Sequence, residues 1–216
     1  YSTKKKIYSY DWISEKSELS LDFKHGDIIS FAIINGNKYV LTKNGLYKYA
    51  ASNKPDGVLT SNQYKRMTSV QGGTKLYLLR DGYVDIVDTD IDLDKRPIIK
   101  KVALGALDAS KQVSMKTDSI GNIYLIEKSG KVTKIKDTSY TITKTQYDVK
   151  GTSVGSEPIF TDLAVSDDTV YLATKNYLAK YIDTENKISI SDSDVPNALG
   201  EKQVKKEMSY SKIKFY

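Results

Sequence analysis

The sequence predicts an all-β fold built from repeated antiparallel hairpin units, and three observations support this. A tyrosine followed by two apolar residues returns four times, at Tyr39, Tyr77, Tyr124 and Tyr171, with spacings of 38, 47 and 47 residues. Each repeat lies between two turn signals, most of which contain Gly or Asn. The composition favours strands, with 17 Tyr and many Ile and Thr residues. A period of this length indicates stacked or circularly arranged supersecondary units.

Each of the four units is predicted to contain four short strands. The strands are expected at 28–34, 38–42, 46–50 and 57–61, at 66–70, 75–79, 83–87 and 98–104, at 113–117, 123–127, 131–135 and 139–147, and at 160–165, 169–174, 178–182 and 187–191. Turns such as Asn44-Gly45 and Asp81-Gly82 supply the positive φ that hairpins need. The second strand of each unit is apolar at consecutive positions, which predicts burial of both its faces. The third strands, such as Leu46–Tyr49, alternate more cleanly, as expected for strands further from the centre of the fold.

The two ends of the chain read as parts of one further unit. Lys6–Tyr10 and Glu18–Phe23 resemble the last two strands of a unit, and Met208–Tyr216 resembles the start of one. Joining both termini would complete a fifth unit and remove exposed sheet edges. We therefore expect one domain over residues 1–216 with five units, and four units are the alternative. The segment Asn197–Met208 is the best candidate for a short surface helix.

Several units resemble the generic β-propeller repeat. Asp118-Ser119-Ile120-Gly121-Asn122-Ile123-Tyr124 followed by Gly130-Lys131-Val132 has its turn, its aromatic-apolar strand and its second turn. Leu59-Thr60-Ser61-Asn62 followed by Leu76-Tyr77 resembles blades of sensory propellers of the two-component-regulator type. The resemblance covers roughly Ile28 to Ile190. It implies a β-propeller of five four-stranded antiparallel blades, with the closing blade built from both termini. Propellers are scaffolds whose function lies in their loops.

Composition limits the function classes. The 216-residue chain has no Cys, so it can form no disulfide and has no thiolate nucleophile or ligand. Its 33 basic and 27 acidic residues are well mixed, which predicts a solvated surface; an anion-binding face is the alternative, and nucleic acid is not favoured. No apolar run reaches the roughly 20 residues of a membrane span. The composition and the start at Tyr1 suggest a piece of a longer polypeptide or assembly, located extracellularly, at the cell surface or on a virion.

The residues that usually carry chemistry form no recognised motif. His25 is the only histidine, and we expect it to be a loop residue without a catalytic or metal-binding role. The most concentrated acidic feature is the run Asp85, Asp88, Asp90, Asp92 and Asp94. Its Asp88–Asp92 part has the alternating spacing of a Ca²⁺ loop, but Leu93 stands where such a loop needs Gly. We therefore predict a solvated acidic loop, no metal and no cofactor. The chain is not expected to be an enzyme.

An aromatic cluster near the N-terminus is the candidate ligand-binding site. Tyr8, Tyr10 and Trp12 follow the three lysines Lys4–Lys6, and aromatics beside cations can stack on sugars or bases. The alternative is that these rings pack within the closing blade. We expect a non-enzymatic recognition module, with a protein or glycan ligand, in a surface-exposed or virion-associated protein. A hydrolase or lyase with a channel-facing site, and a structural spacer in a larger assembly, are the other hypotheses.

Overall fold

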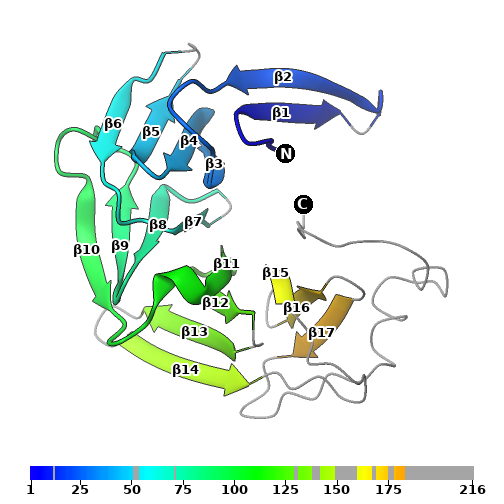
Figure 1. Cartoon of the computed structure of the whole chain (residues 1–216), viewed down its shortest axis with the longest axis vertical. Helices are drawn as coiled ribbons and strands as arrows, with labels where there is room; N and C mark the ends of the chain where they lie inside the picture. The colour runs from blue at the N-terminus through cyan, green and yellow to red at the C-terminus, as the bar shows by residue number, and fades with distance from the viewer. Residues whose placement is uncertain are drawn as a thin grey trace. The chain divides into compact units, whose positions relative to one another are not determined.

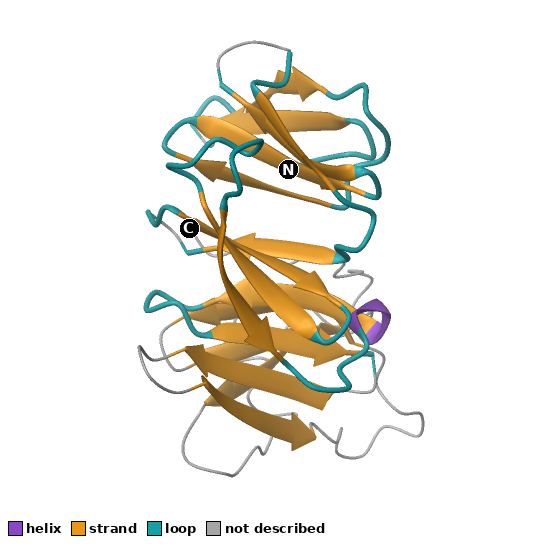
Figure 2. Ribbon diagram, turned by 90° about the vertical axis from the view of Figure 1, so that its left-hand side faces the viewer, coloured by secondary structure: helices purple, strands orange, loops and turns teal. Residues whose placement is uncertain are grey.

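In the part of the chain that the structure describes, the computed structural model is all-β, with antiparallel sheets and one short 3₁₀ helix, η1 (Ala109–Lys111) (Figures 1 and 2). It divides into two compact units, Tyr1–Ala109 and Ser110–Tyr216. The structure describes residues 1–11, 13–50, 54–70, 72–128, 131–137, 142–148, 160–166, 169–174 and 178–182. No helix in these ranges has the length and hydropathy that a membrane crossing requires.

The first unit begins with a two-stranded sheet. Strand β1 (Lys6–Asp11) pairs antiparallel with β2 (Lys16–Asp22), and a β-bulge interrupts the register between Ile7 and Tyr8. A bulge of this kind bends the strand and increases its local twist. These strands agree with the two that the sequence predicts at the N-terminus.

The first four-stranded sheet has the order β3-β4-β5-β6. Its strands are β3 (Ser30–Ile34), β4 (Asn37–Thr42), β5 (Gly45–Tyr49) and β6 (Gly57–Thr60). Asn35 and Gly36 connect the first two strands with φ values of 49° and 77°, as the Asn-Gly signal predicts.

The second four-stranded sheet has the order β10-β9-β8-β7. Its strands are β7 (Arg66–Ser69), β8 (Lys75–Arg80), β9 (Tyr83–Asp88) and β10 (Ile98–Ala103). The connection that follows β10 is fixed to the β8–β9 turn, because Gly82 N–H donates to Leu107 O at 2.9 Å and Ala109 N–H donates to Asp81 Oδ1 at 2.9 Å.

The second unit holds one four-stranded and one three-stranded sheet within the described residues. The former contains β11 (Gln112–Thr117), β12 (Ile123–Glu127), β13 (Lys131–Asp137) and β14 (Ile142–Asp148), and the latter contains β15 (Phe160–Ser166), β16 (Thr169–Thr174) and β17 (Leu178–Ile182). The strand positions predicted in all four repeats are thus confirmed wherever they are described. The strand expected at 187–191, the helix at 197–208 and the strand at 208–216 lie outside the described residues.

The sheet β3–β6 is packed on both faces inside the first unit. One face joins the sheet β7–β10 in a core that includes Leu41, Leu46 and Leu78. The other face packs on the β1–β2 hairpin, where Tyr47 and Tyr49 join a second cluster. Burying both faces explains why the second strands are apolar at consecutive positions.

The alternation of the third strands does not correspond to an exposed face in this unit. In β5 every residue except Lys48 is buried, and in β9 the four residues 84–87 are all buried. The reason for β5 is that neighbouring elements cover both of its faces, so its polar-apolar alternation does not report solvent exposure.

The recurring tyrosines are packing residues, as the repeat predicts. Tyr39, Tyr77 and Tyr124 are buried, whereas Tyr171 is only half-buried. The phenol of Tyr39 donates a hydrogen bond to Thr89 O at 3.4 Å, which satisfies its buried hydroxyl.

Candidate functional site

The predicted aromatic site lies on β1. Tyr8 is half-buried and stacks on Tyr1, with ring centroids 5.0 Å apart and an angle of 12° between the rings. Tyr10 is 39% exposed. Trp12, the third member of the predicted cluster, lies outside the described residues. Tyr8 and Tyr10 are therefore on one strand, but only Tyr10 presents much of its ring to solvent.

The far half of the β1–β2 hairpin carries further exposed apolar side chains. Ile13 in the turn is 97% exposed, and Leu19 on β2 is 53% exposed. The base of the hairpin is anchored, because Ile7 and Leu21 are buried in the core shared with the sheet β3–β6. The hairpin thus displays apolar and aromatic groups from a fixed base.

The single histidine lies in the connection between β2 and β3, as expected. The exposed ring of His25 stacks on Tyr47, with centroids 5.1 Å apart, and meets Phe23 edge-on at 5.6 Å. These contacts extend the aromatic core to the surface. They give His25 a packing role in this unit.

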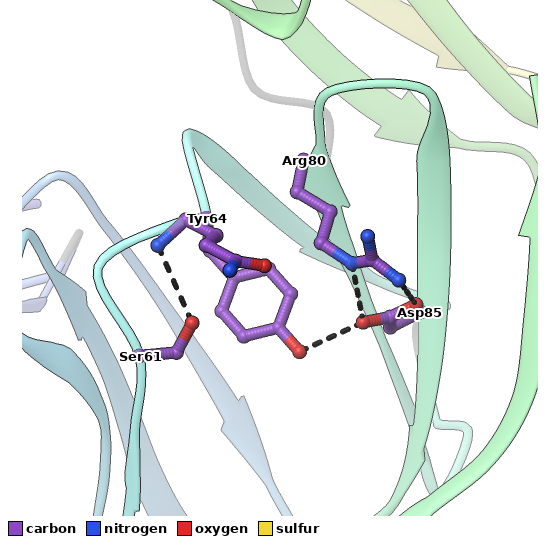
Figure 3. A network of polar contacts seen from close by, with 5 residues as sticks. Ser61, Tyr64, Arg80 and Asp85 are labelled. Atoms are coloured by element: carbon purple, nitrogen blue, oxygen red, sulfur yellow. Dashed lines mark hydrogen bonds and ion pairs between the residues drawn. The ribbon is translucent and has the colours of Figure 1, made fainter.

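A buried charged network, which the sequence analysis did not identify, lies on the sheet β7–β10 (Figure 3). The Asp85 carboxylate is 2% exposed and accepts two hydrogen bonds from Arg80, from Nε at 2.9 Å and from Nη2 at 3.2 Å. The Tyr64 hydroxyl donates a third, at 2.9 Å. Tyr64 comes from the connection between β6 and β7, which is supported where Gln63 N–H donates to Ser61 Oγ. The network therefore ties this connection to β8 and β9.

The electrostatics of the network keep the Tyr64 phenol neutral and the Arg80 guanidinium charged near neutral pH. Burial, together with the hydrogen bond to Asp85, raises the pKa of the Tyr64 phenol well above its ordinary value. The hydrogen bond to Asp85 raises the pKa of the Arg80 guanidinium. A neutral phenol and a permanent cation surrounding a carboxylate suit a structural clamp better than proton transfer near neutral pH.

Two other buried carboxylates are occupied by neighbouring groups. Asp118, before β12, accepts from the backbone N–H of Asn122 at 2.8 Å and from its side-chain amide at 2.6 Å, which shapes the turn. Asp162 on β15 accepts a hydrogen bond from the Ser114 hydroxyl on β11, which links the two sheets of the second unit. Both are acceptors within the scaffold.

The acidic run is a local network. The Asp88 carboxylate accepts the backbone N–H of Asp90 at 3.0 Å, and Lys95 pairs with Asp92 at 2.9 Å. Across the described ranges, no three His, Asp or Glu side chains converge in a way that could hold a metal ion. The loop geometry agrees with the expected solvated loop for Asp88–Asp94, but the expectation is wrong for Asp85, which is buried on β9 and paired with Arg80 and Tyr64.

Comparison with known proteins gives no relative in sequence. No protein-family model matches the chain, and no curated protein matches it. The comparison of structures, in contrast, finds many similar chains.

Three solved structures illustrate the similarity. The WD40 domain of Neurospora crassa Pan2 matches 82% of this chain with a TM-score of 0.56 and 13% identity. Chaetomium thermophilum Raptor matches 89% with a TM-score of 0.63 and 13% identity. A domain reported as the extracellular part of a hybrid two-component system from B. thetaiotaomicron matches 87% with a TM-score of 0.59 and 16% identity.

These matches decide the fold class. The chain has a propeller-type fold. The resemblance to the generic β-propeller repeat is thereby confirmed. The match covers 54% of the Pan2 domain, 19% of Raptor and 25% of the two-component domain, so the chain spans about half of those structures or less. At this level of identity the similarity concerns the fold alone.

Proposed function

We propose that the chain is a non-enzymatic recognition module that binds a protein partner through the β1–β2 hairpin. The observation that carries the proposal is the exposure of Tyr10, Ile13 and Leu19 on a hairpin whose base is buried in the core. Neighbouring apolar side chains in solvent are typical of interaction sites.

A protein is the favoured ligand because aliphatic side chains accompany the aromatic ones. Leucine and isoleucine pack on apolar protein surfaces, whereas sugar sites mainly use aromatic faces and polar groups. WD40-type domains among the structural neighbours are consistent with a protein-binding scaffold. A glycan ligand remains the alternative outcome of the binding test.

We also propose that the chain forms one five-bladed propeller over residues 1–216. The β1–β2 sheet has two strands, whereas three other described sheets have four. A strand from residues 208–216 added to this hairpin would build the closing blade and cover an edge. A four-bladed arrangement is the alternative, with the hairpin as a separate appendage.

The proposed setting is the surface of a cell or virion, within a larger polypeptide or assembly. Its support is the Cys-free, Lys- and Tyr-rich composition and the fold shared with an extracellular domain. Immunodetection on intact cells or particles, with and without permeabilisation, tests it. Signal only after permeabilisation would contradict a surface location.

The binding proposal is tested by affinity capture and a glycan array with the purified chain. Once a partner is identified and purified, its affinity is measured for the wild type, Tyr10→Ser and Leu19→Ser. Each variant should weaken binding by about tenfold, as truncation of an interface anchor does. Ile120→Ser removes a comparably exposed apolar group from the second unit and should leave the affinity unchanged.

Thermal unfolding of each variant separates loss of binding from loss of fold. If the hairpin variants are folded and bind as tightly as the wild type, the hairpin is not the recognition surface. If the chain binds only glycans, the partner class is wrong while the surface can still be tested by the same variants.

A further inference from the structure

Arg80 is held in one orientation at the turn end of the sheet β7–β10. The buried Asp85 carboxylate engages its Nε and Nη2 atoms side-on. The guanidinium carbon also lies 4.3 Å from the ring centroid of Tyr83, the residue paired with Arg80 across the two strands. Such a doubly held arginine loses little further rotamer entropy when it binds a ligand.

The side-on contact with Asp85 leaves the outer edge of the guanidinium unused, on a side chain that is 18% exposed. A guanidinium carries five N–H donors, and Asp85 uses one on Nε and one on Nη2. Nη1 points away from Asp85 (Figure 3) and makes no hydrogen bond to the described part of the chain. Nη1 and the second Nη2 hydrogen therefore form an end-on fork, which matches the two oxygens of a carboxylate.

Two exposed side chains project from the same face of the sheet as Arg80. Tyr83 is 41% exposed and offers an aromatic edge beside the cation. Lys101 on β10 is exposed and pairs in register with Asp85. Residues opposite one another in adjacent strands project from the same face, so Lys101 lies on the face that carries Arg80 and Tyr83.

We propose that Arg80, Tyr83 and Lys101 form a second binding site, which takes a carboxylate side chain from an acidic peptide segment of a partner protein. The carboxylate would bridge Nη1 and Nη2, with Lys101 beside it and the apolar part of the peptide on Tyr83. The formal charge of +6 on the chain attracts an acidic partner. This site is independent of the β1–β2 hairpin.

NMR of the arginine side chains tests the proposal directly. The chain has three arginines, Arg66, Arg80 and Arg96, so their Nε–H signals can be assigned by single substitution. The probe is a blocked pentapeptide with glutamate at its second and fourth positions, titrated to about 10 mM at constant ionic strength. The Arg80 signal should shift with saturation, and those of Arg66 and Arg96 should not. The matching glutamine peptide should cause no shift.

Variants that keep Asp85 paired make the test robust, because Arg80→Gln can unfold the sheet. Tyr83→Leu and Lys101→Gln should each weaken the peptide affinity about two- to fivefold. Lys75→Gln removes the same charge at the opposite end of β8 and should change it little. The proposal is overturned if Arg80 does not respond, if the glutamine peptide acts equally, or if Lys75→Gln weakens binding as much as Lys101→Gln.

Discussion

The buried Asp85 carboxylate determines which substitutions the protein can accept at the residues that contact it. A buried charge is costly unless it is paired and hydrogen-bonded. Asp85 meets that requirement with three donors, two from Arg80 and one from Tyr64. Removing Arg80 takes away a positive charge and two donors, whereas removing the Tyr64 hydroxyl takes away one neutral donor. Arg80 should therefore contribute more to the stability of the fold than Tyr64.

Arg80→Gln should lower the free energy of unfolding by about 3 kcal/mol, because it leaves a buried carboxylate without its counter-ion. Tyr64→Phe should cost about 1 kcal/mol, since one neutral donor is lost. Urea unfolding at pH 7, followed by circular dichroism, measures both. Arg96→Gln, at an exposed arginine, is the matched control. Equal stability of Arg80→Gln and the wild type would show that Asp85 does not depend on the pair.

Buried phenols should make the protein sensitive to alkali. Burial, with a smaller effect of Tyr47, raises the pKa of Tyr49 to about 12, and burial also raises that of Tyr39. An acid with a higher pKa in the folded state stabilises the fold fully below its unfolded pKa of about 10. That stability is lost as the pH rises from about 10 towards about 12.

Urea midpoints at pH 8, 10 and 11 measure this loss. The free energy of unfolding should be flat between pH 8 and about 9.5, and then fall by up to about 1.4 kcal/mol per pH unit for each such group. Tyr49→Phe keeps the aromatic contact with Phe23 but has no ionisable phenol, so its stability should fall less steeply. Identical slopes for both proteins would contradict a buried Tyr49 phenol.

At the residue scale, the sequence predicted which side chains pack in the core better than it predicted which polar side chains pair with one another. Tyr39, Tyr77 and Tyr124 recur at fixed intervals, and this repetition is the signal of a core position. The sequence analysis placed Asp85 in the acidic run and predicted that it is solvated, because neither the Arg80 partner five residues away nor the Tyr64 partner 21 residues away can be identified from the sequence. In the other three repeats, the residues that occupy the position equivalent to Asp85 are Tyr47, Thr133 and Ala179. No repeated residue type therefore marks this position in the sequence.

At the scale of the element, hairpin turns determine where the strands begin and end. Asn-Gly and Asp-Gly pairs supply the positive φ of the turn, and the apolar runs between them become strands. This is why the strands described here begin and end within three residues of the predicted positions. The burial of the third strands could not be predicted from the sequence, because it depends on the elements packed against both faces of the sheet and not on the alternation within the strand.

Glycine at position 45 is required by both conformation and space. Gly45 has a φ of 151°, and a Cβ there would lie 2.5 Å from Leu59 O on the neighbouring β6. Gly45→Ala should therefore cost more than Gly36→Ala, where φ is also positive but no atom lies within 4 Å. We expect about 1 kcal/mol for Gly36→Ala from backbone strain alone and a clearly larger loss for Gly45→Ala. Thermal unfolding of both variants measures the difference, and equal losses would contradict the close approach of β5 and β6.

For the whole molecule, the sequence predicted the propeller-type fold because its repeats carry the same turn and strand pattern throughout. The number of blades is a different question, since it depends on whether distant ends of the chain pair, and no local pattern determines that. The binding surface could likewise be predicted only in part. Tyr8 and Tyr10 follow from the sequence, but the exposure of Leu19 depends on how the hairpin is anchored.

Pairing of the two ends in one blade is the central claim about the whole molecule, and an electron-spin distance measurement tests it most directly. The chain has no Cys, so Ser17→Cys on β2 and Ser211→Cys near the C-terminus can be labelled specifically. Strands in one sheet are about 4.8 Å apart, so a shared blade predicts a single narrow distribution centred below about 25 Å. A broad distribution at longer distances would contradict the five-bladed arrangement.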